Sequence, residues 1–274
     1  MSCGARRNLE ANGLTLALFE WGRAEAPPLL LLHSLAAHSH WWDWAASLWA
    51  GRRRVIALDF RGHGASAHAV PAVYAFDDYA ADTLAALDAL GLAHPVVVGH
   101  SMGAYVAAYV ASLHPERVRA LVIADMLTGW TPEQAEGAKR QAARPAPQFA
   151  NWAEARDRFK FQPPATRAPG DRIRHLAEAS VQQTAPGVWQ LAFDRSVFLH
   201  PPVNPWPFLP AVVCPTLVIH GEGSTIMDRR AAERVAAAVG RGSVVTLTGT
   251  FHHLMLDDPA GFVAVVDGWL TAAH

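Results

Sequence analysis

Short apolar runs alternate along the chain with longer amphipathic stretches. The apolar runs have strand length and cover residues 29–32, 55–58, 96–98, 121–124, 216–219 and 244–247. Runs that are apolar throughout are typical of strands buried on both faces of a sheet. Helical spacing of apolar positions separates them, over 79–90, 102–113, 228–239 and 259–272. This alternation predicts an α/β fold with a mostly parallel β-sheet flanked by helices.

The stretch from residue 127 to residue 207 breaks the alternation. It has no clear strand pattern, it concentrates proline and aromatic residues, and helical patterns cover 132–143, 151–159 and 171–183. We therefore predict an inserted helical cap over residues 127–207, with a core built from residues 1–126 and 208–274. The insertion follows the carboxyl end of a predicted strand, where α/β folds bind ligands.

The pentapeptide at 99–103, Gly-His-Ser-Met-Gly, joins a predicted strand to a predicted helix. A turn this tight strains its apex residue and brings the flanking backbone close to neighbouring strands, so glycine is needed on both sides. The turn raises the Ser101 hydroxyl above the sheet and directs the Met102 amide toward an oxyanion on an attacked carbonyl. We predict Ser101 as a nucleophile and the Met102 N–H group as an oxyanion donor.

Four further motifs accompany the pentapeptide. They are His33-Ser34-Leu35, the stretch 59–66 (Asp-Phe-Arg-Gly-His-Gly-Ala-Ser), His220-Gly221-Glu222, and the stretch 251–259 that begins Phe-His-His and ends Asp-Asp-Pro. With these motifs the chain resembles the α/β-hydrolase superfamily from about residue 10 onward. The resemblance is to serine hydrolases of the carboxylesterase type, and it implies an α/β-hydrolase fold.

A serine nucleophile needs a general base, because an unassisted hydroxyl is almost fully protonated at neutral pH. The resemblance implies His252 as that base and the Leu35 amide as the second oxyanion donor. Two residues depart from the usual family pattern, since Ser34 and Phe251 both stand where glycine is common. We expect His33 to be buried against the loop backbone, His253 to pack or face solvent, and the stretch 59–66 to have a structural role.

The resemblance also implies a catalytic triad, in which an acidic residue orients the histidine. The position that commonly holds this aspartate is Ser224 here. Asp125, Glu222 and Asp228 are the candidates. The catalytic histidine needs a carboxylate at the carboxyl edge of the sheet, and Asp125 ends a buried strand there. Certain haloalkane dehalogenases are similar in taking their acid from this strand. Glu222 lies two residues too early and Asp228 resembles a helix N-cap, so we predict Asp125.

Composition limits which classes of partner and which cellular compartment we expect for the protein. The 274 residues are 51% hydrophobic and 17% charged, with a formal net charge of -1, which favours neither nucleic acid nor an anionic membrane as a partner. The two cysteines, Cys3 and Cys214, form no disulfide framework, which fits a reducing cytoplasm. No signal peptide and no apolar stretch of about 18 residues is present, so we expect a soluble protein with a small-molecule substrate.

Several aromatic residues and histidines are candidates to line a substrate pocket. Most of the tryptophans at 41, 42, 44 and 49 are expected to pack a helix onto the sheet, with one or two reaching the pocket. We predict His100, Trp42 and Trp130 as substrate contacts. His38 and His40 have no acidic or cysteine partner at ligand spacing, so we expect them on the surface or in loops and predict neither a metal nor a cofactor.

These features predict a serine hydrolase that cleaves carboxylic esters of small apolar substrates through an acyl-enzyme intermediate. Hydrolysis of a carbon–carbon bond in a vinylogous diketone, or lactone, amide or perhydrolase chemistry, would use the same triad. A ligand receptor on a retained hydrolase fold is a further alternative, because the usual acid position is vacant. An epoxide hydrolase or haloalkane dehalogenase is disfavoured, because those members of the fold use aspartate as the nucleophile.

Overall fold

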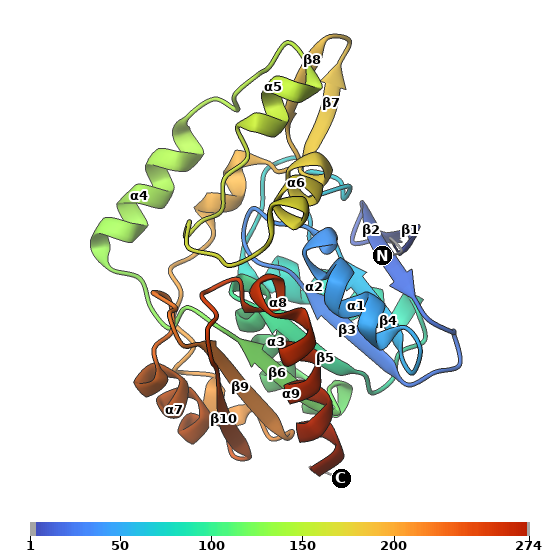
Figure 1. The fold of residues 1–274 in the computed structure, drawn as a ribbon, viewed down its shortest axis with the longest axis vertical. Coiled ribbons are helices and arrows are strands. Elements are labelled where there is room, and N and C mark those ends of the chain that lie inside the picture. The colour runs from blue at the N-terminus through green and yellow to red at the C-terminus, as the bar shows by residue number, and fades with distance from the viewer. Residues whose placement is uncertain (1–3, 273–274) are drawn as a thin grey trace.

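An eight-stranded sheet forms the centre of the computed structural model, which describes residues 4–272 (Figure 1). At one edge β1 (Ala5–Ala11) and β2 (Leu14–Trp21) run antiparallel, and the remaining strands are parallel to one another. In spatial order these are β4 (Arg54–Leu58), β3 (Pro28–Leu32), β5 (Val96–His100), β6 (Ala120–Ala124), β9 (Thr216–Gly221) and β10 (Gly242–Leu247). Each predicted apolar run is a strand, which confirms the predicted mostly parallel sheet.

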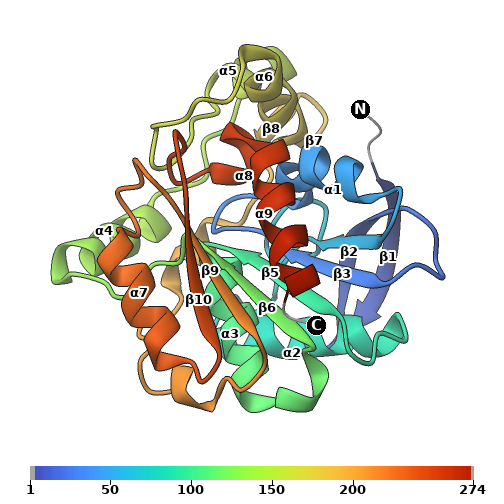
Figure 2. The same ribbon diagram turned by 60° about the horizontal axis from the view of Figure 1, so that its bottom comes forward.

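Helices cover both faces of the sheet and create two apolar cores (Figure 2). One core contains α2 (Phe76–Ala89), α3 (Met102–Leu113) and α7 (Arg229–Ala238), and the other contains α1 (Asp43–Trp49), α8 (Leu254–Asp257) and α9 (Pro259–Ala272). Alternate residues of β3 enter alternate cores, because successive side chains of a strand point to opposite faces. The wholly apolar strands follow from this double burial.

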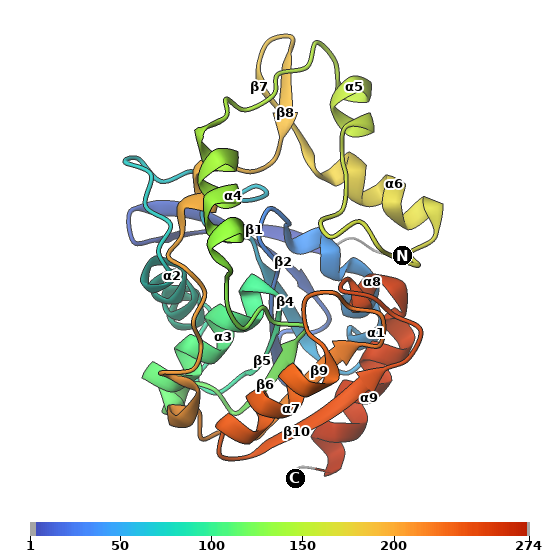
Figure 3. The same cartoon turned by 90° about the vertical axis from the view of Figure 1, so that its left-hand side faces the viewer.

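We call residues 127–207 the cap segment. Its elements are α4 (Pro132–Ala143), α5 (Trp152–Asp157), α6 (Gly170–Ala179), β7 (Val181–Ala185), β8 (Val188–Leu191) and η3 (Arg195–Leu199). Most of it, with α4, α5, α6, β7 and β8, gathers beyond the end of the sheet at which β5 meets α3 (Figures 1 and 3). Short 3-10 helices occur here and elsewhere in the chain. In the core lie η1 (Ser39–Trp42), η2 (Pro115–Arg117) and η4 (Leu209–Ala211).

Two hairpins differ from the sequence expectations. The helix predicted over 171–183 ends at Ala179, and β7 and β8 follow as a two-stranded sheet whose turn contains Gly187 at φ +73°. Strand β1 pairs with β2 through a turn at Asn12 and Gly13, both at positive φ. Asn-Gly is a strong hairpin signal, whereas the mostly exposed residues of β1 show little apolar pattern of their own.

The structure also gives findings on membrane-spanning helices and on the cysteines. No helix within the described range is long and apolar enough to cross a membrane. Cys214 is buried with a free thiol. Cys3 lies outside the described residues.

Candidate active site

Ser101 occupies the apex of the turn between β5 and α3, at φ +54° and ψ -116°. A Cβ atom on Gly99 would stand 2.3 Å from the Gly103 carbonyl oxygen, and one on Gly103 would stand 2.3 Å from the Leu32 carbonyl oxygen. Only glycine fits at both positions without displacing backbone. The turn therefore adopts the strained backbone conformation predicted for this serine.

Asp125 and His252 meet at the same edge of the sheet. Asp125 directly follows β6, is fully buried, and has its Oδ1 atom 2.8 Å from His252 Nδ1. A histidine that donates Nδ1–H to a carboxylate presents Nε2 as an acceptor, which is the tautomer a general base requires. The two residues are 127 positions apart in the chain, so the tertiary fold alone creates this contact.

Ser224, which occupies the position where the family commonly has an acid, forms a hydrogen bond with the Asp125 carboxylate. Ser224 Oγ donates to Asp125 Oδ1 at 2.6 Å, and the Gly221 amide donates to Asp125 Oδ2 at 3.0 Å. These bonds satisfy a buried carboxylate that would otherwise be costly to keep charged, and they orient it toward His252. Ser224 is a positioning residue that the sequence interpretation treated only as a vacancy.

The two other acid candidates point elsewhere. Asp228 caps α7 and accepts a hydrogen bond from the Ala231 amide at 2.7 Å, as the N-cap pattern indicated. Glu222 is exposed and accepts from the Gly249 amide at 2.8 Å. Among the carboxylates of the described residues, Asp125 is the one that contacts His252.

Ser101 and His252 line one cavity of about 970 Å³ between the core and the cap segment. The core also contributes Ser34, Leu35 and Trp41. The cap segment contributes aromatic and basic side chains, which include Phe159, Phe161, Phe193, Phe198, Arg158, Lys160 and Arg195. Ser101 and His252 therefore face a common space large enough for a small organic molecule.

The amides predicted as oxyanion donors are available for a ligand. Within residues 4–272, neither the Leu35 nor the Met102 N–H group donates to an acceptor of the protein. Met102 begins α3, where helix geometry leaves the first amides unpaired, and Leu35 lies in the loop that follows β3. Ala36, the next residue, has φ +57°. The loop thus adopts an unusual backbone conformation even though Ser34 stands in the place of glycine.

Two further histidines pack around His252. His100 Nε2 lies 2.9 Å from the carbonyl oxygen of His252, and His253 Nε2 lies 2.9 Å from that of Pro163. Burial, followed by the charge of His252, lowers the pKa of His100 well below its ordinary value and that of His253 to about 3. Both therefore stay neutral near pH 7 and hold the loop of the base in place.

The predicted substrate contacts His100, Trp42 and Trp130 do not line this cavity. His100 is buried beneath His252, Trp42 is fully buried with its ring 6.1 Å from that of Phe262, and Trp130 packs on His200 at 4.6 Å. These predictions are wrong. Trp41 lines the cavity instead. In the 3-10 helix η1, adjacent tryptophans face different sides, and the sequence does not show which side faces the pocket.

The loops predicted to be structural are structural. Asp59 Oδ1 accepts from the Ser39 amide at 2.6 Å and Asp59 Oδ2 from the Ala65 amide at 2.8 Å. His33 is buried, its Nδ1 donates to the Ser34 carbonyl at 2.7 Å, and its Nε2 accepts from the Phe60 amide at 3.0 Å. Burial lowers the pKa of His33 to about 4, which keeps the ring neutral in this role.

Two groups of side chains in the described chain have the composition of metal ligands, His100 with His252 and His253, and His40 with Asp43 and His175. In the second group, His40 Nδ1 and His175 Nε2 lie 3.0 Å and 2.7 Å from Asp43 Oδ2. The expectation that His40 lacks an acidic partner is wrong, because Asp43 lies one helical turn later and α6 of the cap segment supplies His175. His38 lies in a loop as expected, but it is buried.

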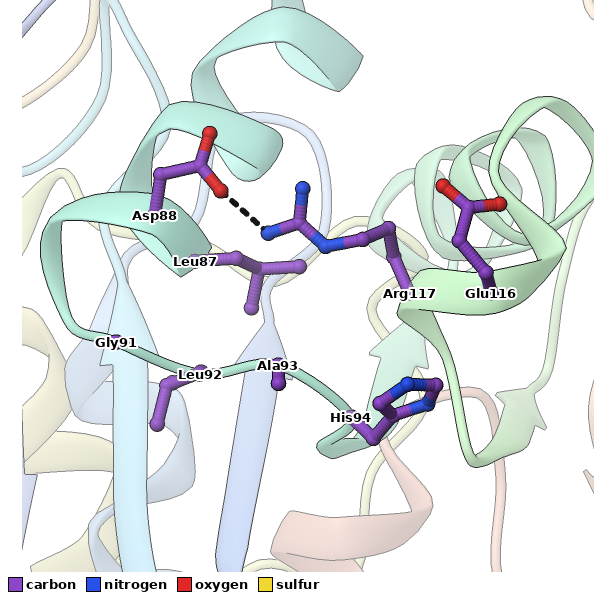
Figure 4. A pocket seen from close by; sticks show the side chains of 8 residues that line it. All are labelled: Leu87, Asp88, Gly91, Leu92, Ala93, His94, Glu116 and Arg117. Carbon is purple, nitrogen blue, oxygen red and sulfur yellow. Dashed lines mark hydrogen bonds and ion pairs between the residues drawn. The ribbon is translucent and has the colours of Figure 1, made fainter.

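A separate hollow lies near the amino ends of β5 and β6, and Figure 4 shows the residues that line it. Its lining includes residues 91–94, which precede β5, and Arg117, which precedes β6 and pairs with Asp88 at 2.5 Å. Ser101 follows the carboxyl end of β5, so this hollow is at the amino ends of the strands and away from the triad. It brings no nucleophile together with a base.

Residues 27–177 match the family model of the alpha/beta hydrolase fold. This chain belongs to that family. The match runs from the start of β3 through the turn at Ser101 and on into the cap segment. The α/β-hydrolase fold predicted from the sequence motifs is thereby confirmed.

Named relatives of this α/β-hydrolase family member differ in how much of the chain they share. The dihydrolipoyllysine-residue acetyltransferase component of the acetoin cleaving system of Pseudomonas putida is 39% identical over 117 residues, 43% of this chain and 31% of that protein. This chain therefore spans about a third of that relative. The 2-(acetamidomethylene)succinate hydrolase of Mesorhizobium japonicum is 26% identical over 251 residues, 90% of this chain and 88% of that protein.

Solved structures show the same fold over nearly the whole chain. The crystal structure of E-2-(acetamidomethylene)succinate hydrolase superposes with a TM-score of 0.83 at 23% identity and covers 98% of this chain and 99% of that one. The thioesterase domain from the curacin biosynthetic pathway superposes with a TM-score of 0.82 at 23% identity, with 97% and 99% covered. At this level of identity the likeness concerns the fold.

Proposed function

We propose that this protein is a serine hydrolase that cleaves carboxylic esters of small substrates through an acyl-enzyme intermediate. The observation that carries the proposal is the 2.8 Å contact between Asp125 and His252, at a cavity that His252 shares with a serine held at a strained turn. The predicted carboxylesterase activity is retained here as a proposal.

The first half of the reaction forms the acyl-enzyme. His252 Nε2 accepts the Ser101 hydroxyl proton as Oγ attacks the ester carbonyl, and Asp125 stabilises the resulting imidazolium. The Leu35 and Met102 amides donate to the oxyanion of the tetrahedral intermediate. When this intermediate collapses, the bond to the alcohol oxygen breaks and His252 returns the proton to the leaving alcohol.

The second half regenerates the enzyme. Water attacks the acyl carbonyl and gives a proton to His252, the same amides stabilise the second oxyanion, and the acid leaves as Ser101 recovers its proton. Every group in this scheme lies at the carboxyl edge of the sheet, which follows from the parallel strand order. No metal or cofactor takes part in these steps.

Labelling with a fluorophosphonate, combined with turnover of p-nitrophenyl butyrate, tests the proposal. The wild-type protein is expected to label and to turn over, and Ser101→Ala to lose the label and about 10³-fold or more of kcat. Ser112→Ala is the matched control, because Ser112 lies on the same helix, outside the cavity, and its hydroxyl donates to the Tyr109 carbonyl. An unlabelled wild type, or a Ser101→Ala variant that keeps its turnover, contradicts the proposal. A diketone cleaved faster than any ester assigns carbon–carbon hydrolysis instead.

A further inference from the structure

The active-site cavity has an excess of positive charge. Its lining includes Arg158, Lys160 and Arg195, and within the described part of the chain it includes no aspartate or glutamate. The whole chain has 23 basic and 24 acidic residues, so overall composition does not explain this local excess. Uncompensated cations at a partly desolvated surface attract an anionic ligand.

The loop that carries two of these cations is anchored beside the catalytic base. Phe161 is buried, with its ring 5.3 Å from Trp41 and 4.9 Å from His253. The hydrogen bond between His253 Nε2 and the Pro163 carbonyl oxygen ties the same loop to the residue after His252. Lys160, which directly precedes Phe161, is therefore held at a defined place relative to the triad.

The third cation, Arg195, approaches from another part of the cap segment and, within residues 4–272, forms its side-chain hydrogen bonds with the neutral residue Gln141. Arg195 Nε donates to the Gln141 carbonyl oxygen at 2.8 Å, and Nη2 donates to that oxygen at 2.5 Å and to Gln141 Oε1 at 2.8 Å. Burial, followed by the charge of Arg144, lowers the pKa of Arg195, as expected where no carboxylate neutralises it. A fixed guanidinium without an acidic partner is well suited to bind a carboxylate.

Arg156, two residues before Arg158, shows the contrasting arrangement. It is paired with Asp157 at 2.6 Å outside the cavity. None of the three cavity cations forms an ion pair with a described residue. The cavity therefore holds three cations that no carboxylate of the described residues neutralises.

We propose that the cap end of this cavity is a subsite for a carboxylate of the substrate, held by Arg158, Lys160 and Arg195. The inference rests on the proposed function and names its substrate class, an ester with a carboxylate remote from the bond that is cleaved. Phe159, Phe161 and Phe193 line the same cavity and suit a short apolar spacer between the two ends. The sequence predicts a small apolar substrate, and the subsite changes this expectation to a small amphipathic one.

A pair of esters that differ only in charge tests the subsite. The charged member is the mono-p-nitrophenyl ester of glutaric acid, and the neutral member is the same ester with its free acid methylated. We expect kcat/KM to favour the charged ester by about tenfold at low ionic strength. The preference is expected to fall as salt is added, because screening weakens attraction between partly exposed charges.

Substitutions test which side chains cause the preference for the charged ester. Arg158 and Lys160 are exposed, so Arg158→Gln and Lys160→Gln are expected to fold and to reduce the charged-to-neutral ratio of kcat/KM. Arg195→Lys keeps the charge but loses the hydrogen bonds that fix the guanidinium on Gln141, and is expected to reduce the ratio less than Arg195→Gln does. The matched control is Arg174→Gln, which removes one charge from an exposed site of α6 outside the cavity and is expected to leave the ratio unchanged.

A binding measurement decides the subsite without turnover. Calorimetry is expected to detect glutarate binding to the wild-type protein, at least about tenfold tighter than binding of its neutral diamide. Equal binding of the two compounds, no binding of either, or a ratio of kcat/KM that Arg174→Gln changes as much as Lys160→Gln overturns the subsite. If both esters are cleaved equally, the subsite is wrong and the ester hydrolase stands. If glutarate binds but neither ester is cleaved, the subsite stands and the proposed function is wrong.

Discussion

The two sides of the cavity are built in different ways. On the core side, backbone geometry and buried hydrogen bonds hold the reactive groups, as at Ser101 in its strained turn and Asp125 beneath His252. On the cap side, side chains from loops and short helices line the cavity, and Arg158 and Lys160 are exposed. We expect a change on the core side to alter the fold or the chemistry, and a change on the cap side to alter what binds. On this proposal the core side sets the reaction class and the cap side selects the substrate.

The sharpest test of the core side is Asp125→Asn. The amide cannot stabilise the imidazolium and favours the wrong tautomer of His252, so kcat is expected to fall by up to about 10⁴-fold. Asp228→Asn is the matched control, because an asparagine N-cap preserves α7 and turnover is expected to remain. Steady-state kinetics on p-nitrophenyl butyrate measures both variants. Full activity in Asp125→Asn together with a dead Asp228→Asn would falsify the assignment of the acid.

A methyl group at Gly103 tests how tightly the turn is packed. Its Cβ would stand 2.3 Å from the Leu32 carbonyl oxygen, so Gly103→Ala is expected to cost about 3 kcal/mol of the free energy of unfolding. Gly268→Ala is the control, since nothing lies within 4 Å of a Cβ there and a helix interior is expected to gain about 0.5–1 kcal/mol. Urea unfolding compares the two. Equal stability of both variants would show that the turn is not packed as described.

Ser224 links the acid to the loop after β9, and its removal is expected to have a smaller effect. Ser224→Ala deletes one donor to the Asp125 carboxylate, which is expected to lower kcat/KM by about tenfold with little change in KM. Ser224→Thr retains a hydroxyl and is expected to recover most of the loss. If alanine and threonine behave alike, the hydroxyl does not position the acid.

A pH series tests the contact between the core and the cap segment at which His40 and His175 lie against Asp43. The quantity of interest is the stability that this contact contributes. Burial alone would lower the pKa of His40, but the hydrogen bond and charge of Asp43 outweigh it and raise that pKa. A raised folded-state pKa stabilises the protein below the unfolded value of about 6.5, and the contribution disappears as pH rises through the folded value.

Thermal unfolding between pH 5 and pH 9 measures this contribution. The advantage of the wild type over Asp43→Asn is expected to shrink as the pH rises, because His40 loses its charge. A difference between the two proteins that stays constant across the series would assign Asp43 a role independent of His40 protonation.

Much of the core followed from local sequence patterns. The strands at 29–32 and 121–124 are predictable because burial on both faces demands continuous apolar residues. The turn at Ser101 is predictable because its glycines and flanking elements are contiguous in the chain. Helix α4 has the bounds that the sequence predicts, and in the structure Thr131 and Gln134 form a capping box at its start, where proline begins the helix.

The cap segment was less predictable for a physical reason. Its strands β7 and β8 are short and partly exposed, so little apolar periodicity marks them. The cations at 158 and 195 are remote in sequence and converge only when α5 and η3 reach the same cavity. Charged residues on a solvated loop have no sequence signal that distinguishes a ligand subsite from ordinary surface.

The sequence by itself determined the fold family and the identity of the candidate nucleophile, because backbone strain, glycine spacing and apolar periodicity are properties of neighbouring residues. The sequence also predicts Asp125 among three carboxylates, and only the tertiary structure shows its contacts with His252 and Ser224, since strand order brings residues 125, 224 and 252 to one point. The tertiary structure also decided that Trp41 rather than Trp42 faces the cavity and that the cavity is cationic. Those outcomes depend on contacts between distant segments, which a local pattern does not encode.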